Sequence, residues 1–185
     1  MKRIRKQQEA GFTLIEMIVV VVLVAILATI ATPSFLTFLT RQRLSDAQAE
    51  AMSAIREAQA KAKQQKRFWE VCVKDDNAKV AWFTRPVPQN NPDCSTNPGY
   101  WNNLIGPDAD KIQIDVSNSS LTNGYYNVKF KPNGWVDDQT QTDPTADVKK
   151  ITFQLRNQGG GSKRCVYVAT LLGAVRTASN DDCKK

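Results

Sequence analysis

The stretch GFTLIEMIVVVVLVAIL, residues 11–27, decides the fold of this chain. It opens an apolar run from Phe12 to Leu39 that contains a single charged residue, Glu16, and a single proline, Pro33. About 20 apolar residues span a bilayer, so the run predicts a membrane-spanning helix with a kink near Pro33. A carboxylate inside such a helix is costly unless it is paired, which marks Glu16 as a candidate functional residue.

The segment before this run is basic, with four basic side chains and one acidic one in residues 1–11. The positive-inside rule places this end in the cytoplasm and the chain after the helix on the other side of the membrane. A secretory signal peptide, cleaved near residues 29–31, is the alternative. Glu16 argues against that alternative, because the apolar core of a signal peptide is uninterrupted by charge.

The four cysteines fit an exported domain, because disulfides persist outside the cytoplasm. The sequence allows three pairings, of which we favour the two local ones, Cys72–Cys94 and Cys165–Cys183. No cysteines have the C-x-x-C spacing of zinc sites, and the chain contains no histidine. We therefore expect no metal and no cofactor.

The composition also argues against an enzyme. Without histidine, Ser-His-Asp and Cys-His catalysis are excluded. The GGGSK segment, residues 159–163, lacks the spacing of a phosphate-binding loop. Residues 69–185 carry fourteen basic and thirteen acidic side chains, so any basic surface on this part of the chain has to be local.

Residues 34–68 have the periodicity of a helix with one apolar face. Small and apolar side chains recur there at steps of three and four, and the remaining positions are mostly charged or amide side chains. We therefore expect one long helix from Phe12 to about Phe68, whose second half lies under a soluble domain. The residues of the expected buried face are Leu44, Ala47, Ala51, Ala54, Ile55, Ala58 and Ala62.

Beyond Trp69 the period changes from 3.6 to two, which is typical of strands. Asn133-Gly134 lies between two apolar runs and predicts a hairpin turn. The fold class that follows is α+β, with a long N-terminal helix packed under an antiparallel sheet. The expected strands cover residues 79–83, 111–116, 125–130, 149–155 and 164–171.

The N-terminus resembles that of type IV pilins and type II secretion pseudopilins. The resemblance rests on the short basic leader, the motif Gly11-Phe12-Thr13-Leu14-Ile15-Glu16, and the apolar helix broken by Pro33. It implies cleavage after Gly11 by a prepilin peptidase and N-methylation of the new Phe12. It also implies that Glu16 sets the registration of helices during filament growth.

The same resemblance divides the chain into a leader (1–11), a transmembrane and assembly helix (12–33), an amphipathic half of the helix (34–68) and a β-rich head (69–185). The implied partners are other pilin or pseudopilin subunits, the prepilin peptidase and the inner-membrane assembly platform. The implied location is the bacterial inner membrane before assembly, and then the pilus or pseudopilus.

The head is similar to the pseudopilin H/FimT family of minor pilins. Phe130, Pro132 and Gly134 match its Phe-x-Pro-x-Gly hairpin, and Gly173 and Arg176 match part of its C-terminal Gly-Arg-x-Arg, in which an alanine replaces the first arginine. FimT-like members are associated with DNA capture, so a DNA-binding minor pilin is the alternative function. The candidate DNA-binding residues are Lys163, Arg164, Arg176, Lys184 and Lys185.

Overall fold

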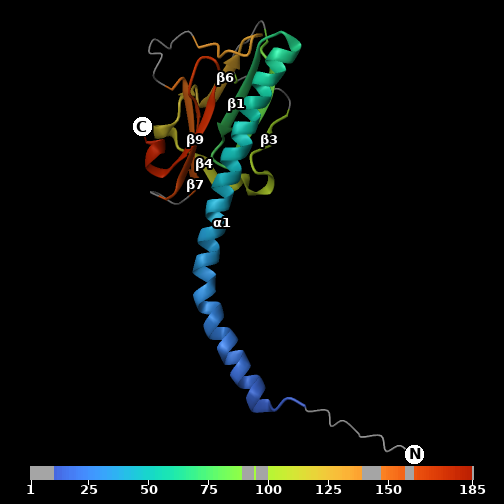
Figure 1. The fold of residues 1–185 in the computed structure, drawn as a ribbon, viewed down its shortest axis with the longest axis vertical. Helices are drawn as coiled ribbons and strands as arrows, with labels where there is room; N and C mark the ends of the chain where they lie inside the picture. The colour runs from blue at the N-terminus through green and yellow to red at the C-terminus, as the bar shows by residue number, and fades with distance from the viewer. Residues whose placement is uncertain (1–10, 89–93, 95–99, 139–146, 157–160, 185) are drawn as a thin grey trace, which may run out of the picture. The chain divides into compact units, whose positions relative to one another are not determined.

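A computed structural model of the chain describes residues 11–88, 94, 100–138, 147–156 and 161–184, without the side chains of residues 30–34 and 36. The chain divides into two compact units, Met1–Leu39 and Thr40–Lys185. One helix, α1 (Leu14–Gln65), contributes to both units and is drawn as a coiled ribbon in Figure 1.

Among the residues that the structure describes, no helix is both long enough and apolar enough to cross a membrane. The predicted transmembrane role of residues 12–33 therefore stays a prediction. The kink expected at Pro33 also remains a prediction, because the side chain of Pro33 is not among those that the structure describes.

The second half of α1 buries the face that its periodicity predicts. All seven residues of that face are at most 2% exposed. Most of them are alanines, which allow the strands to approach the helix closely. The helix ends at Gln65, and Lys66 follows with a φ of 54°, the left-handed conformation in which many helices terminate.

The first sheet has the strand order β3-β2-β1-β6-β5, and its neighbouring strands are antiparallel. Its centre is formed by β1, in which Val71 lies opposite Thr84 of β2 and Val128 of β6. Two short 3-10 helices, η1 (Gly106–Asp110) and η2 (Val116–Asn118), lie between the strands in sequence. The strands are β1 (Trp69–Asp75), β2 (Val80–Pro86), β3 (Asn102–Asn103), β5 (Leu121–Thr122) and β6 (Tyr125–Phe130).

The second sheet has the order β4-β7-β8-β9 and is also antiparallel. The C-terminal 3-10 helix η3 (Asn180–Cys183) follows its last strand. The expectation of a single sheet was therefore wrong, because the chain passes back and forth between two sheets on either side of β5 and β6. The strands are β4 (Ile112–Ile114), β7 (Lys149–Leu155), β8 (Lys163–Val168) and β9 (Val175–Ser179).

Both sheets and the second half of α1 share one hydrophobic core, which includes Ile55 of the helix, Val71 of the first sheet and Phe153 of the second. Among the residues whose burial is described, every buried apolar one lies between Leu44 and Cys183. Residues 40–185, which we call the head unit, thus contain a complete core of their own. The α+β fold class predicted from the sequence is confirmed.

Two disulfides close loops within the head unit, Cys72–Cys94 and Cys165–Cys183. These are the two local pairings that the sequence analysis favours. The first ties β1 to the segment that follows β2, and the second ties β8 to η3. All four cysteines are at most 1% exposed, so both bonds are part of the packed interior.

Candidate functional site

The N-terminal motif begins α1 with a side-chain cap. The backbone N–H of Glu16 donates to the Thr13 hydroxyl oxygen at 3.3 Å, and the N–H of Met17 donates to the Thr13 carbonyl oxygen at 3.2 Å. Thr13 and Glu16 thus stand at the positions of the S/T-x-x-E capping signature. The spacing of Thr13 and Glu16 in the sequence is by itself a signal for this helix cap, and it was missed above.

Helix α1 starts at Leu14, so Phe12 lies before the helix. The structure therefore does not place the amino group that cleavage would create at Phe12 one turn before Glu16 in the same helix. Glu16 itself is exposed in the isolated subunit. Its carboxylate also lies in the first turn, where the helix dipole favours a negative charge.

The first half of α1 exposes apolar side chains around its whole circumference. From Leu14 to Leu27 every large apolar residue is between 47% and 78% exposed, and Phe12 is 78% exposed. A soluble helix normally carries such residues on one face only. The apolar side chains of this segment are therefore available for contact with lipid or with other helices.

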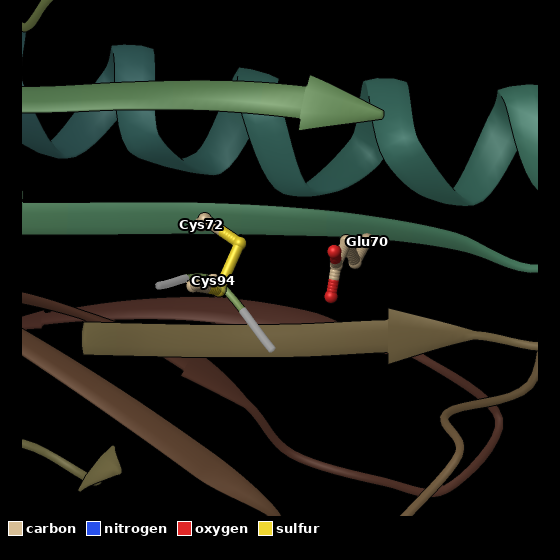
Figure 2. A group of neighbouring side chains, drawn as sticks. All are labelled: Glu70, Cys72 and Cys94. Carbon is tan, nitrogen blue, oxygen red and sulfur yellow. A yellow bond between two sulfur atoms is a disulfide. The ribbon is translucent and has the colours of Figure 1, made fainter. Parts of the chain in front are cut away.

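The structure brings Glu70, Cys72 and Cys94 together, with one potential metal-ligand atom from each within 4.8 Å of the others. Figure 2 shows the Glu70 and Cys72 side chains on the same side of β1, with Cys72 bonded to Cys94. The sulfurs are joined in a disulfide and are not available as thiolate ligands. The carboxylate is also occupied, because the Arg85 Nε donates to it at 2.7 Å and the Asn127 amide at 2.8 Å.

The four candidate DNA-binding residues that the structure describes do not form an open cationic surface. Lys163 contacts the carboxylate of Asp115 at 2.5 Å, and Lys184 contacts that of Asp181 at 2.6 Å. Both lysines line an open depression of about 420 Å³ between the start of β8 and η3, together with Asp181. The positive charges of Lys163 and Lys184 are thus largely balanced by neighbouring carboxylates.

The other candidate DNA-binding residues that the structure describes do not line this depression. Arg176 pairs with Asp147 at 2.6 Å and lies over the ring of Tyr167, with 4.0 Å between its Cζ and the ring centroid. Arg164 is half-buried in β8, three residue pairs along the ladder from Arg176. Lys185 lies outside the described residues. Nothing in this arrangement favours the DNA-binding alternative.

Comparisons with known proteins support the interpretation of the N-terminal motif and of the fold. Residues 6–32 match the prokaryotic N-terminal methylation motif. Crystal structures of the type IV minor pilin FimU from Pseudomonas aeruginosa are similar to this chain. One match covers 79% of this chain and 98% of the crystallised FimU chain, with 14% identity and a TM-score of 0.50. The other covers 76% of this chain and 99% of the crystallised FimU chain, with 12% identity and a TM-score of 0.46.

No curated protein matches the chain. The chain thus carries the N-terminal methylation motif found in prokaryotic pilins and has the fold of a type IV minor pilin. The match to the motif includes Gly11, Phe12 and Glu16, and ends before the head unit begins.

Proposed function

We propose that this chain is a minor pilin, a structural subunit that is processed after Gly11, methylated at Phe12 and assembled into a filament through the first half of α1. The carrying observation is the exposure of apolar side chains around that entire helical segment, next to a matching N-terminal methylation motif. A helix of this kind is stable in lipid and, in an assembly, among other apolar helices.

In this proposal the chain first crosses the bacterial inner membrane once, with its N-terminus in the cytoplasm. The prepilin peptidase removes residues 1–11, and the inner-membrane platform then moves the subunit into the pilus or pseudopilus among other subunits. Glu16 acts during that step, because a carboxylate surrounded by apolar helices needs a cationic partner. The new amino group of Phe12 in a neighbouring subunit is the partner that the cleavage creates.

The test is the incorporation of full-length variants into sheared filaments in the native host. Glu16→Ala should leave cleavage after Gly11 intact, because the cut lies outside the helix, and should remove the subunit from the filament fraction. The matched control is Asp46→Ala, which removes an exposed carboxylate from the second half of the same helix. Normal incorporation of Glu16→Ala would contradict the assembly role.

The cleavage assignment has its own test. Gly11→Arg should block processing, because the peptidase requires a small residue before the cut. Intact-mass measurement distinguishes the uncut chain from the mature one, and it also reports the added methyl group on Phe12. A mature mass from Gly11→Arg would contradict cleavage at this position.

A further inference from the structure

Side chains from three strands of the first sheet gather at the Cys72–Cys94 disulfide. Glu70 and Cys72 are two residues apart in β1 and therefore point to the same face of the sheet. In the register of the sheet, Arg85 of β2 lies opposite Glu70, and Asn127 of β6 lies opposite Cys72. Cys94, from the segment between β2 and β3, completes the cluster through its bond to Cys72 (Figure 2).

The Asn127 amide marks a point that three potential ligand atoms face. Its nitrogen lies 2.8 Å from Oε2 of Glu70, 2.6 Å from the Cys94 sulfur and 3.4 Å from the Cys72 sulfur. A zinc ion held by thiolates and a carboxylate lies about 2.3 Å from each sulfur and about 2.1 Å from the oxygen. The amide nitrogen therefore stands close to the position that such an ion would take.

An open pocket leads to this cluster from the surface. Its volume is about 360 Å³, and both Cys94 and Asn127 are among its lining residues. The Asn127 side chain is half-buried and borders the pocket, so it can turn into this space and leave the point between the ligand atoms. The pocket thus supplies the entry path that a metal site needs.

The oxidation state of the sulfurs decides whether they can bind an ion. The thiolate is the metal ligand, so the disulfide form is closed to metal. Two sulfurs on one tetrahedral ion lie about 3.8 Å apart, which follows from a metal–sulfur distance of about 2.3 Å. The Cα atoms of Cys72 and Cys94 are 5.9 Å apart, so rotation of the two reduced side chains can supply that separation without a movement of β1.

The surroundings match the charge of such a site. A divalent ion on two thiolates and one carboxylate carries one net negative charge, which the guanidinium of Arg85 balances. The Arg85 Nε donates to Oε1 of Glu70 at 2.7 Å, and Oε2 faces the sulfurs. Ligating carboxylates usually have an outer hydrogen-bond partner of this kind, which fixes their orientation.

We propose that Glu70, Cys72 and Cys94 form a metal site in the reduced chain, and that formation of the Cys72–Cys94 disulfide closes it. Two thiolates and a carboxylate suit a thiophilic divalent cation such as zinc. The ion holds the segment after β2 against β1, which is the connection that the disulfide makes in the oxidised chain. This site is independent of filament assembly and stands or falls separately from the minor-pilin function.

The second disulfide provides a matched comparison. Among the described residues, no carboxylate joins Cys165 and Cys183 in a group of three ligand atoms that all lie within 4.8 Å of one another. Two thiolates without a third ligand hold a divalent ion less tightly, because such ions prefer four-coordinate sites. Metal binding should therefore be confined to the first cysteine pair.

The experiment is a titration of the full chain, in detergent micelles, with Co²⁺, whose charge-transfer absorption reports thiolate ligands. A water-soluble phosphine first reduces the disulfides: each S–S bond takes up two electrons and the two protons of one water molecule, and the phosphine becomes its oxide. Metal binding then releases one proton from each thiol. We expect one Co²⁺ per reduced chain, displaced by Zn²⁺, and none in the oxidised chain. A reduced chain without thiolate-to-cobalt absorption would overturn the proposal.

Cysteine variants identify the pair that binds the ion. Cys72→Ala with Cys94→Ala should abolish the absorption, because it removes both sulfur ligands. Cys165→Ala with Cys183→Ala should keep it, because that pair lies outside the site. Absorption that survives the loss of Cys72 and Cys94 would refute the site.

Carboxylate variants test the third ligand. Glu70→Gln should weaken Co²⁺ binding by about tenfold or more, since the loss of even an outer partner of a metal ligand has an effect of that size. The control is Asp115→Asn, which removes another buried carboxylate with a cationic partner and should leave the affinity unchanged. Equal affinity in Glu70→Gln and the wild type, or an equal loss in Asp115→Asn, would contradict the role of Glu70.

Thermal melting distinguishes a folded site from thiols on an unfolded chain. Zinc in large excess over its dissociation constant should raise the melting temperature of the reduced chain by about 5 °C or more, and should not change that of the oxidised chain. The same shift should be missing from reduced Cys72→Ala with Cys94→Ala. Cobalt absorption without a cooperative, zinc-dependent transition would show that an unfolded chain binds the ion, and the proposal would then fail.

Discussion

Replacing Arg85 with methionine should destabilise the head unit strongly, because it leaves the carboxylate of Glu70 buried without its cation. The Glu70 side chain is fully buried and that of Arg85 is 11% exposed. Their 2.7 Å contact is the most deeply buried ion pair among the described residues. Once Arg85 is gone, the amide of Asn127 is the side-chain donor that remains to that carboxylate among the described residues, and one neutral donor does not compensate a buried charge.

The expected magnitude is about 3 to 5 kcal/mol, the usual cost of removing one partner from a buried ion pair. For a domain of this size each kcal/mol lowers the melting temperature by about 3 °C, so Arg85→Met should lower it by roughly 10 to 15 °C. Glu70→Leu should also be destabilising, because it removes this carboxylate from the buried guanidinium of Arg85.

The double variant decides whether the pair is the cause. Glu70→Leu with Arg85→Met removes both charges, and an apolar replacement of a buried ion pair is often close to neutral. We therefore expect the double variant to be more stable than Arg85→Met alone, with a coupling free energy of about 2 kcal/mol or more. The assay is urea unfolding of residues 40–185 with the disulfides intact.

A matched control is available in the exposed pair of Lys111 and Asp110, whose side chains are about half exposed. Lys111→Met should leave the melting temperature unchanged, because water screens this pair. The reasoning would be refuted if Arg85→Met were as mild as the control, or if the effects of Glu70→Leu and Arg85→Met simply added.

Three further perturbations follow from the head unit. Replacing both residues of Cys165–Cys183 with alanine, which opens a loop with a sequence separation of 18, should lower the free energy of unfolding by about 3 kcal/mol, measured in urea. Gly173→Ala should cost about 2 to 3 kcal/mol, because the left-handed backbone becomes strained and the Gln59 amide is displaced from its hydrogen bonds. Gln59→Ala, which removes only those hydrogen bonds, should cost less in the same assay. Burial opposes the charged form of Asp115, but the hydrogen bond and charge of Lys163, together with the hydrogen bonds from Asn118, outweigh burial and hold the pKa of that carboxyl below its usual 3.8. This contribution is present above pH 3.8 and is lost as the pH falls through the lowered pKa, so Asp115→Asn should destabilise the head at neutral pH and lose that effect in acid, as thermal unfolding against pH will report.

Much of the fold follows from local patterns in the sequence. The buried face of α1 was predicted residue by residue, because a helix has one fixed period and its alanines and leucines occur at that period. Strands β6 and β7 were predicted with their boundaries, since apolar and polar residues alternate in β6 and β-branched and aromatic residues dominate the centre of β7. The N-terminal motif could be read directly, because its residues are contiguous.

Strand β1 was missed because its sequence, Trp69–Asp75, places a glutamate among residues that are buried on both faces, so neither alternation nor an unbroken apolar run is visible. Only the tertiary structure shows that Glu70 meets Arg85 across the β1–β2 pair and is thereby acceptable in the core. Strand β9 was missed because most of its residues are polar or small, and it is recognised only through its pairing with β8.

The sequence by itself determined the long helix, the α+β class and the processing motif, since each depends on neighbours along the chain. The tertiary structure alone decided the division into two sheets, the pairing of Lys163, Arg176 and Lys184 with carboxylates, and the joining of the distant turns that follow β6 and β8. Those features depend on which residues meet across separations of tens of positions. Local patterns in the sequence carry no information about such contacts, because these depend on strand register and on how the folded chain brings distant segments together.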